Sequence, residues 1–307
     1  MTASPAAAPP AAVQRRGPRR AALKPPSLPL RAGLWVASRS LRTMGGFRYV
    51  LADTLGLALY AAQPDRARQC AANHRRLERG IDGVEARRRA RGSFREFMRT
   101  SFDFVWAYAV PPERMDRYFI SAGTGPVYDA LDRLGGAVFA LAHYGSWDVA
   151  AACALRLQIP ITTVMTTVGE SDLATRVAGW ARRQQDMEVL MTRGAAIGLL
   201  RAVRSGRCDA ILCDIPDRGQ RTTVNFCGGM VAFSTAPAWI ARTAGVPLLP
   251  VHCWREDGGY ILKVYAPVRV GGEVSDAEAM QAVADVLAIQ VRRMPEQWYP
   301  FGEVFKD

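Results

Sequence analysis

Short apolar runs and longer amphipathic stretches alternate along the chain from residue 135 to its end. Apolar or β-branched runs of about four to eight residues predict strands, which we expect at 137–142, 160–167, 189–192, 210–213, 246–252 and 260–265. Apolar positions at helical spacing predict helices at 148–157, 172–185, 195–205, 235–243 and 276–293. Ser275 and Glu278 form a capping-box pattern ahead of the last helix. Because strand and helix alternate, we predict an α/β fold with a mainly parallel sheet flanked by helices on both faces.

The first 110 residues have a different pattern. Residues 1–30 are rich in alanine, proline and arginine and predict a solvated, disordered tail. Residues 31–62 interleave large apolar residues with arginines, and Gly45-Gly46 interrupts them. This N-terminal amphipathic helical segment fits membrane-interface helices and, equally well, an ordinary helical hairpin packed on the core. Residues 65–110 are helical in period, so we expect core-packing helices there and a single domain over 31–307.

Composition narrows the class of protein. Hydrophobic residues make up 49% of the 307 residues, which is ample for a sizeable core. The net charge of +12 indicates a polyanionic partner, such as an anionic membrane surface, a phosphorylated or CoA-like substrate, or nucleic acid. Six cysteines without a C-x-x-C pair predict free thiols in a reducing compartment. Without a signal peptide or a run of about 20 apolar residues, we expect a cytosolic protein or one on the cytosolic face of a membrane.

The sharpest chemical signal is His143, which follows the predicted strand 137–142. Open α/β sheets place their chemistry at the carboxyl ends of strands. Asp148 follows five positions later, in the first turn of the next predicted helix, where it is able to hold the imidazole in one tautomer. The pair predicts a general base. The competing interpretation is a strand-end histidine followed by a helix-start acid.

A second candidate site comes directly after the strand 210–213, on the same expected sheet edge. There Asp217 and Arg218 form either a substrate-binding turn, with Arg218 clamping a phosphate or an acyl oxygen, or a solvated turn. Residues 226–238 read as an apolar loop that is able to line a groove for a hydrocarbon chain. Glu170 and Arg182 flank the helix 172–185, and solvated charges are the default interpretation for both.

Other chemistry finds little support. Gly145-Ser146-Trp147-Asp148 is not a nucleophile elbow. The three histidines lack metal-ligand spacing, so we expect no metal and no cofactor. No nucleic-acid-binding motif accompanies the positive charge, and we predict no nucleic-acid partner.

Taken together, these motifs resemble the bacterial lysophospholipid acyltransferase superfamily, and more narrowly the branch of lipid A biosynthesis and phosphatidylinositol mannoside acyltransferases. His143 and Asp148 match its His-x-x-x-x-Asp (HX4D) signature, with Ser146 in the place of the usual asparagine. Glu170, Arg182 and the turn at 216–218 match later blocks in order. Residues 226–238, 245–250 and the closing Pro-x-x-Trp at 295–298 follow in register. Cys227 and Ala236 depart from the usual phenylalanine and glycine.

The resemblance implies an O-acyltransferase that moves a fatty acyl group from acyl-CoA or acyl carrier protein to a hydroxyl of a glycolipid or phospholipid acceptor. It implies that His143 deprotonates the hydroxyl and that Asp148 orients the imidazole. Glu170, Arg182, Asp217 and Arg218 are then candidate substrate-binding residues. The expected place of action is the cytoplasmic face of the cell inner membrane, with the protein peripheral to it. A non-catalytic lipid- or membrane-binding protein on the same fold is the alternative.

Overall fold

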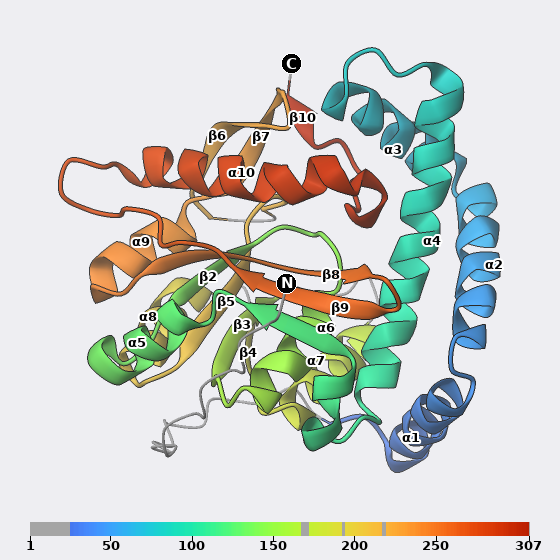
Figure 1. The fold of residues 1–307 in the computed structure, drawn as a ribbon, viewed down its shortest axis with the longest axis horizontal. Helices are drawn as coiled ribbons and strands as arrows, with labels where there is room; N and C mark the ends of the chain where they lie inside the picture. The colour runs from blue at the N-terminus through green and yellow to red at the C-terminus, as the bar shows by residue number, and fades with distance from the viewer. Residues whose placement is uncertain (1–24, 167–171, 192–193, 217–218, 307) are drawn as a thin grey trace.

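A seven-stranded sheet forms the centre of the computed structural model, which describes residues 25–166, 172–191, 194–216 and 219–306 (Figure 1). Its strand order is β1-β9-β8-β2-β5-β3-β4. The strands are β1 (Phe119–Ala122), β2 (Val138–Leu141), β3 (Ile161–Met165), β4 (Glu188–Met191), β5 (Cys208–Leu212), β8 (Leu248–Glu256) and β9 (Gly259–Val264). Only the β8–β9 pair is antiparallel. The predicted mainly parallel sheet is confirmed.

Helices cover both faces of this sheet. One face packs on the helices α8 (Ala195–Arg204), α9 (Ala236–Ala244) and α10 (Asp276–Arg293). The other packs on α5 (Gly125–Leu134), α6 (Trp147–Arg156) and the short 3-10 helix Pro112–Arg117. The helix α7 (Asp172–Gln184) lies beside β4. The predicted capping box is present, since Ser275 Oγ accepts from the Glu278 backbone N–H and the Glu278 carboxylate accepts from the Ser275 backbone N–H.

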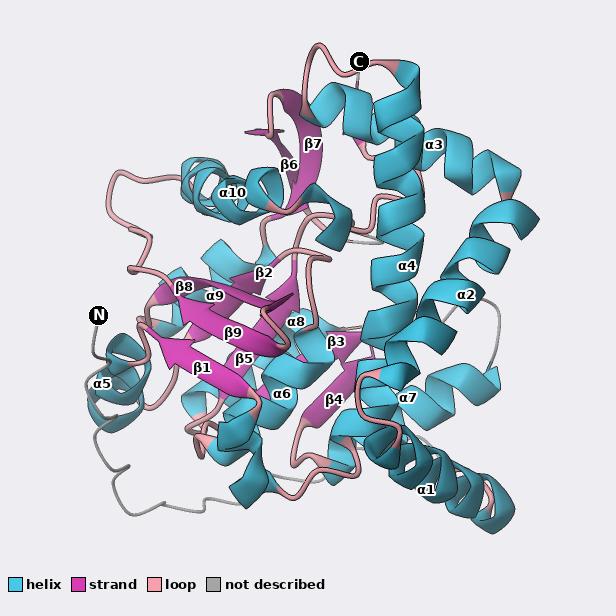
Figure 2. Cartoon of the chain, turned by 45° about the vertical axis from the view of Figure 1, so that its right-hand side comes forward, coloured by secondary structure: helices cyan, strands magenta, loops and turns pink. Residues whose placement is uncertain are grey.

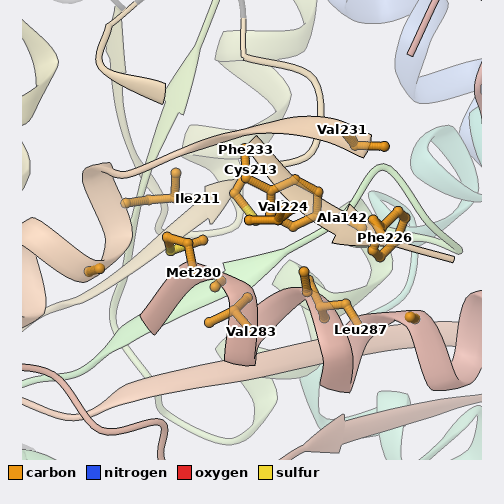
Figure 3. Close-up of a cluster of buried hydrophobic side chains, with 14 of the residues drawn as sticks. Ala142, Ile211, Cys213, Val224, Phe226, Val231, Phe233, Met280, Val283 and Leu287 are labelled. Atoms are coloured by element: carbon orange, nitrogen blue, oxygen red, sulfur yellow. The ribbon is translucent and has the colours of Figure 1, made fainter. Parts of the chain in front are cut away.

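A second, three-stranded sheet lies on the far side of α10 (Figure 1), in the order β10-β7-β6. It comprises β6 (Arg221–Phe226), β7 (Gly229–Ser234) and β10 (Phe305–Lys306). Phe226, Val231 and Phe233 are fully buried between this sheet and α10 (Figure 3). The prediction of an apolar, groove-lining loop over 226–238 is therefore wrong. Cys227 and Gly228 adopt positive φ angles of 55° and 87°, which closes a tight hairpin turn.

Four helices precede the sheet: α1 (Leu28–Thr43), α2 (Phe47–Ala62), α3 (Pro64–Leu77) and α4 (Gly83–Ala107). Helix α1 begins ahead of the boundary expected at residue 31. Figures 1 and 2 show the long helix α4 running beside the sheet, with α2 and α3 packed against it. Asp82 caps the N-terminus of α4, and its carboxylate accepts from the Glu85 backbone N–H at 2.7 Å.

Helix α2 buries Ala52 and Gly56 and exposes several of its large apolar residues. Ala52 and Gly56 face α4, and a Cβ on Gly56 would lie 2.7 Å from the Arg95 Cα. The exposed apolar residues of α1 and α2 are Leu28, Trp35, Val36, Phe47, Val50, Leu51, Leu55 and Leu57. We call this set the outer apolar face. Leu41, Leu59 and Tyr60 of the same helices are partly buried against core clusters, so the membrane-interface interpretation of residues 31–62 stays a prediction. None of the helices among the described residues has the length and apolar content needed to cross a bilayer.

Candidate active site

The candidate site lies where β2 ends, in the middle of the large sheet. All four residues of β2 are buried between β8 and β5, and His143 follows two residues after the strand. Its side chain is 29% exposed. A parallel sheet leaves the carboxyl ends of its strands at one edge, so β2 and β5 deliver their following residues to the same place. This is the position predicted for His143.

The partner of the imidazole is Asp214, which comes directly after β5 and Cys213. His143 Nδ1 lies 2.8 Å from Asp214 Oδ1. The His143 backbone N–H donates to both carboxylate oxygens at 3.0 Å, and the Trp298 indole N–H donates to Oδ2 at 3.1 Å. Three N–H groups from His143 and Trp298 therefore point at this buried carboxylate.

These donors keep Asp214 ionised. Burial by itself raises the pKa of Asp214, but the adjacent His143 charge and the hydrogen bonds from His143 and Trp298 outweigh burial and lower that pKa below its ordinary value. An ionised carboxylate only accepts hydrogen bonds, so Nδ1 must carry the proton that is shared with Oδ1. The lone pair of the neutral ring is then on Nε2, to which no described residue is hydrogen-bonded. The geometry supplies a general base with its orienting carboxylate.

Asp148 has a different partner from the one predicted. It lies in the first turn of α6, and its carboxylate accepts from Arg182 Nε at 2.8 Å and Nη2 at 3.3 Å. The pair is largely buried. Burial lowers the pKa of Arg182, but the Asp148 charge outweighs it and raises that pKa. The expectation that Asp148 orients His143 is corrected: the imidazole pairs with Asp214, because the neighbouring strand in the sheet brings a nearer carboxylate than the chain does.

The other predicted substrate-binding residues divide into two groups. Arg182 is described, and two of its nitrogens are used by Asp148. Glu170, Asp217 and Arg218 lie outside the described residues. The sequence did point to the segment after β5, but to Asp217 and Arg218; the structure brings Asp214, the second residue after β5, to the imidazole. The available signal was a carboxylate immediately after the predicted strand 210–213, on the same expected sheet edge as His143.

The turn between His143 and α6 is closely packed. Gly145 has a φ of +63°, and a Cβ there would lie 2.0 Å from the Cys253 carbonyl oxygen. Only glycine fits this turn, because a side chain would be strained and would clash with β8. The Gly145 carbonyl accepts from the hydroxyls of Thr100 at 3.2 Å and Tyr299 at 3.1 Å. Helix α4 and the C-terminal segment therefore fix the turn from two sides.

Aromatic rings border the imidazole. The half-buried Trp147 ring lies edge-on to His143, with 5.6 Å between the ring centres, and 5.9 Å from Tyr299. Tyr299 in turn contacts Phe97 of α4 at 5.5 Å. Such surroundings exclude water from one side of the base and offer an apolar surface to a substrate. Among the described residues, no cluster of three or more histidine, cysteine, aspartate or glutamate side chains is placed to hold a metal ion.

Comparison with known proteins gives one family. Residues 47–307 match the model of the bacterial lipid A biosynthesis acyltransferases. The phosphatidylinositol mannoside acyltransferase of Mycolicibacterium smegmatis is 30% identical over 178 residues, which cover 56% of this chain and 58% of that protein. A phosphatidylinositol mannoside acyltransferase of Mycobacterium tuberculosis (strain ATCC 25618 / H37Rv) is 30% identical over 169 residues, covering 53% and 52%. The matches thus span little more than half the length of these relatives.

Proposed function

Because the chain belongs to the bacterial lipid A biosynthesis acyltransferase family, we propose that it transfers a fatty acyl group from a thioester donor to a hydroxyl of a membrane glycolipid or phospholipid. The observation that carries this proposal is the pairing of His143, at the carboxyl end of β2, with the buried Asp214. Two relatives named as phosphatidylinositol mannoside acyltransferases favour a glycolipid acceptor of the phosphatidylinositol mannoside or lipid A type.

In the proposed reaction, His143 Nε2 takes the proton of the acceptor hydroxyl as its oxygen attacks the thioester carbonyl. The ester C–O bond forms and the C–S bond breaks, and the departing thiolate takes the proton back from the imidazolium. Asp214 stabilises the imidazolium while it exists. The donor is acyl-CoA or acyl carrier protein, and no covalent enzyme intermediate or cofactor is required.

The residues around this pair have supporting roles in the proposal. Trp147 and Tyr299 shield the base from water on one side. Arg182, with Asp148, holds α6 against α7 and is a candidate for contact with an acyl oxygen. Glu170, Asp217 and Arg218 remain predicted substrate-binding residues.

The outer apolar face supports action at a membrane. Eight large apolar side chains project from α1 and α2, while the net charge of the chain is +12. Exposed apolar residues on helices, combined with arginines, favour binding to an anionic lipid surface. The six buried free thiols fit a reducing compartment. We therefore place the reaction at the cytoplasmic face of the cell inner membrane, with the protein bound peripherally.

The decisive experiment compares the acyl chains of cellular glycolipids and phospholipids by mass spectrometry in cells with the gene, without it, and with variants. We expect one lipid class to lose an acyl chain in the deletion strain, and wild type but not His143→Ala to restore it. Asp214→Asn should lower turnover of the purified enzyme by about 100-fold or more, since it leaves the imidazole without its ionised partner. Full restoration by His143→Ala would exclude acyl transfer by this site and favour the non-catalytic lipid-binding alternative.

A further inference from the structure

The segment Gln297–Tyr299 lies alongside the turn that carries the imidazole. Tyr144 and Trp298 pair as an antiparallel bridge. The Gly145 backbone N–H donates to the Gln297 carbonyl at 2.8 Å, and the Tyr299 backbone N–H donates to the His143 carbonyl at 3.2 Å. Backbone hydrogen bonds on both sides of Trp298 therefore fix its position relative to His143.

The Trp298 side chain is held as firmly as its backbone. It is fully buried, and its ring packs edge-on against Phe226 at 5.7 Å and Phe305 at 5.9 Å. These phenylalanines belong to β6 and β10, so the small sheet sets the direction of the indole. That direction brings Nε1 to 3.1 Å from Asp214 Oδ2.

The indole N–H is a suitable third partner for this carboxylate. It donates and cannot accept, so its hydrogen bond to Oδ2 is made only while that oxygen is an acceptor. With Oδ2 held by Trp298, the other oxygen, Oδ1, is the one at 2.8 Å from His143 Nδ1. A hydrogen bond to an ionised group also spreads its charge, which weakens the hold of Asp214 on an imidazolium.

We propose that Trp298 is a positioning residue of the acyl-transfer site, which fixes the orientation of Asp214 and sets the pH at which His143 becomes a free base. The inference deepens the proposed function and rests on it for its catalytic meaning. The inference states that the Trp298 indole N–H affects the protonation of the His143 imidazole. This effect is measurable without any substrate.

NMR measures the protonation of the His143 imidazole directly, because the chain has only three histidines. Burial lowers the pKa of His74 to about 4 and that of His252 to about 3, so both stay neutral from about pH 5.5 upward. The loss of a pH-dependent imidazole signal in His143→Ala assigns that signal to His143. In Trp298→Phe the carboxylate charge is less dispersed and the imidazolium is better stabilised. We expect the titration midpoint to rise by about half a pH unit or more, and the acid limb of kcat/KM to rise with it.

Trp254→Phe is the matched control. Trp254 is also buried, and its indole N–H also donates to a carboxylate, that of Glu256 at 2.8 Å. Trp254→Phe also removes an indole N–H, but not the one that donates to Asp214. The midpoint of the His143 titration should therefore not change. If Trp298→Phe does not fold, 3-benzothienylalanine at position 298 removes the N–H and retains the shape of the ring.

The outcomes separate this inference from the proposed function. An unchanged or lowered midpoint in a folded Trp298 variant, or an equal rise in Trp254→Phe, overturns the role of Trp298 even if His143→Ala abolishes acyl transfer. A raised midpoint specific to Trp298 supports the coupling. If His143→Ala nevertheless retained full acyl transfer, the coupling would stand and the proposed function would fail.

Discussion

At the level of single residues, Asp148 lies near His143 in the chain but pairs with Arg182. Its partner, Arg182, lies on the next helix, and the side chains are only 9% and 16% exposed. A buried ion pair that loses one member leaves an uncompensated charge. The two residues of the HX4D signature therefore have different partners: His143 pairs with Asp214, and Asp148 links α6 to α7 through Arg182.

We predict that Asp148→Asn lowers the free energy of unfolding by about 3 kcal/mol, because it leaves the Arg182 guanidinium buried without its counter-charge. Urea denaturation followed by circular dichroism measures the loss. The double variant Asp148→Leu, Arg182→Met removes both charges and should recover most of it. A stable Asp148→Asn whose imidazole titration is shifted would instead restore Asp148 as the orienting group.

Asp209 is a second buried carboxylate with a clear pH signature. It lies in β5, and neither of its oxygens has a hydrogen-bond partner among the residues that the structure describes. Burial, aided by Glu188, raises the pKa of Asp209 to about 8 despite the opposing charge of Arg207. Because the folded pKa exceeds the unfolded one, this residue favours the folded state at low pH. That contribution declines above the unfolded pKa of about 4 and is gone once the pH passes about 8.

We therefore predict that Asp209→Asn, which stays neutral, becomes more stable relative to wild type as the pH rises from 5 to 9. The difference should reach several kcal/mol, at about 1.4 kcal/mol per pH unit. The free energy of unfolding is measured for both proteins at each pH. In the difference between the two, the contributions of groups that both contain, such as His74 and His252, cancel. A difference that is constant with pH would show that Asp209 titrates normally.

At the level of elements, the turn between β2 and α6 and the turn between β6 and β7 each contain a glycine at positive φ. They differ in what surrounds it. Gly145 touches the backbone of β8, whereas nothing lies within 4 Å of a Cβ on Gly228. The first glycine is required by packing and conformation together, and the second by conformation alone.

We predict that Gly228→Ala costs about 1 kcal/mol of stability, from left-handed strain alone, and leaves turnover unchanged. Gly145→Ala should cost more than 3 kcal/mol, roughly the cost of severe overpacking, and should abolish turnover because the turn that carries His143 must move. Thermal unfolding and acyl-transfer assays on both variants test this contrast. Equal losses in the two would mean that the β2–α6 turn relaxes without consequence.

At the level of the whole molecule, a network of charges joins the N-terminal helices to the sheet. The fully buried Asp103 of α4 accepts from Arg255 of β8 at 2.6 Å and from the Tyr49 hydroxyl of α2 at 2.9 Å. Arg48 lies 3.6 Å from the same carboxylate. These contacts hold α2 in one orientation, which keeps its large apolar residues on the outside.

We predict that the outer apolar face binds anionic vesicles. The variant Leu51→Ser, Leu55→Ser, Leu57→Ser should weaken binding at least about tenfold, as expected for lost apolar burial at an interface. The control Ile120→Ser, Ile197→Ser, Ile289→Ser removes three apolar residues of β1, α8 and α10 that are more exposed than these leucines. Sedimentation with vesicles of anionic or neutral lipids measures both. Equal weakening by the two triple variants would show that binding is not specific to α1 and α2.

The sequence by itself determined the alternating strands and helices of the large sheet after residue 135 and the place of His143 behind a buried strand. Apolar runs and helical periodicity indicate which residues of a strand or helix are buried. A capping box such as Ser275–Glu278 is formed by residues only three positions apart, so the local sequence predicts it. The residue that follows a buried strand in an α/β pattern is likewise placed by local information. The HX4D spacing added the family, and with it the reaction proposed for the chain.

Only the tertiary structure decided which groups meet. Asp214 reaches His143 across 71 positions because β5 pairs with β2, and Trp298 reaches Asp214 because the C-terminal segment folds back over the β2–α6 turn. The sequence predicts a loop where the structure has the hairpin β6–β7. The apolar residues of this hairpin are buried by α10, which lies far along the chain, so local pattern does not report their burial. Which residues of α2 face outward also depends on its docking against α4, so the sequence left two interpretations of this helix. Contacts between distant elements depend on strand order and docking, which local periodicity does not encode.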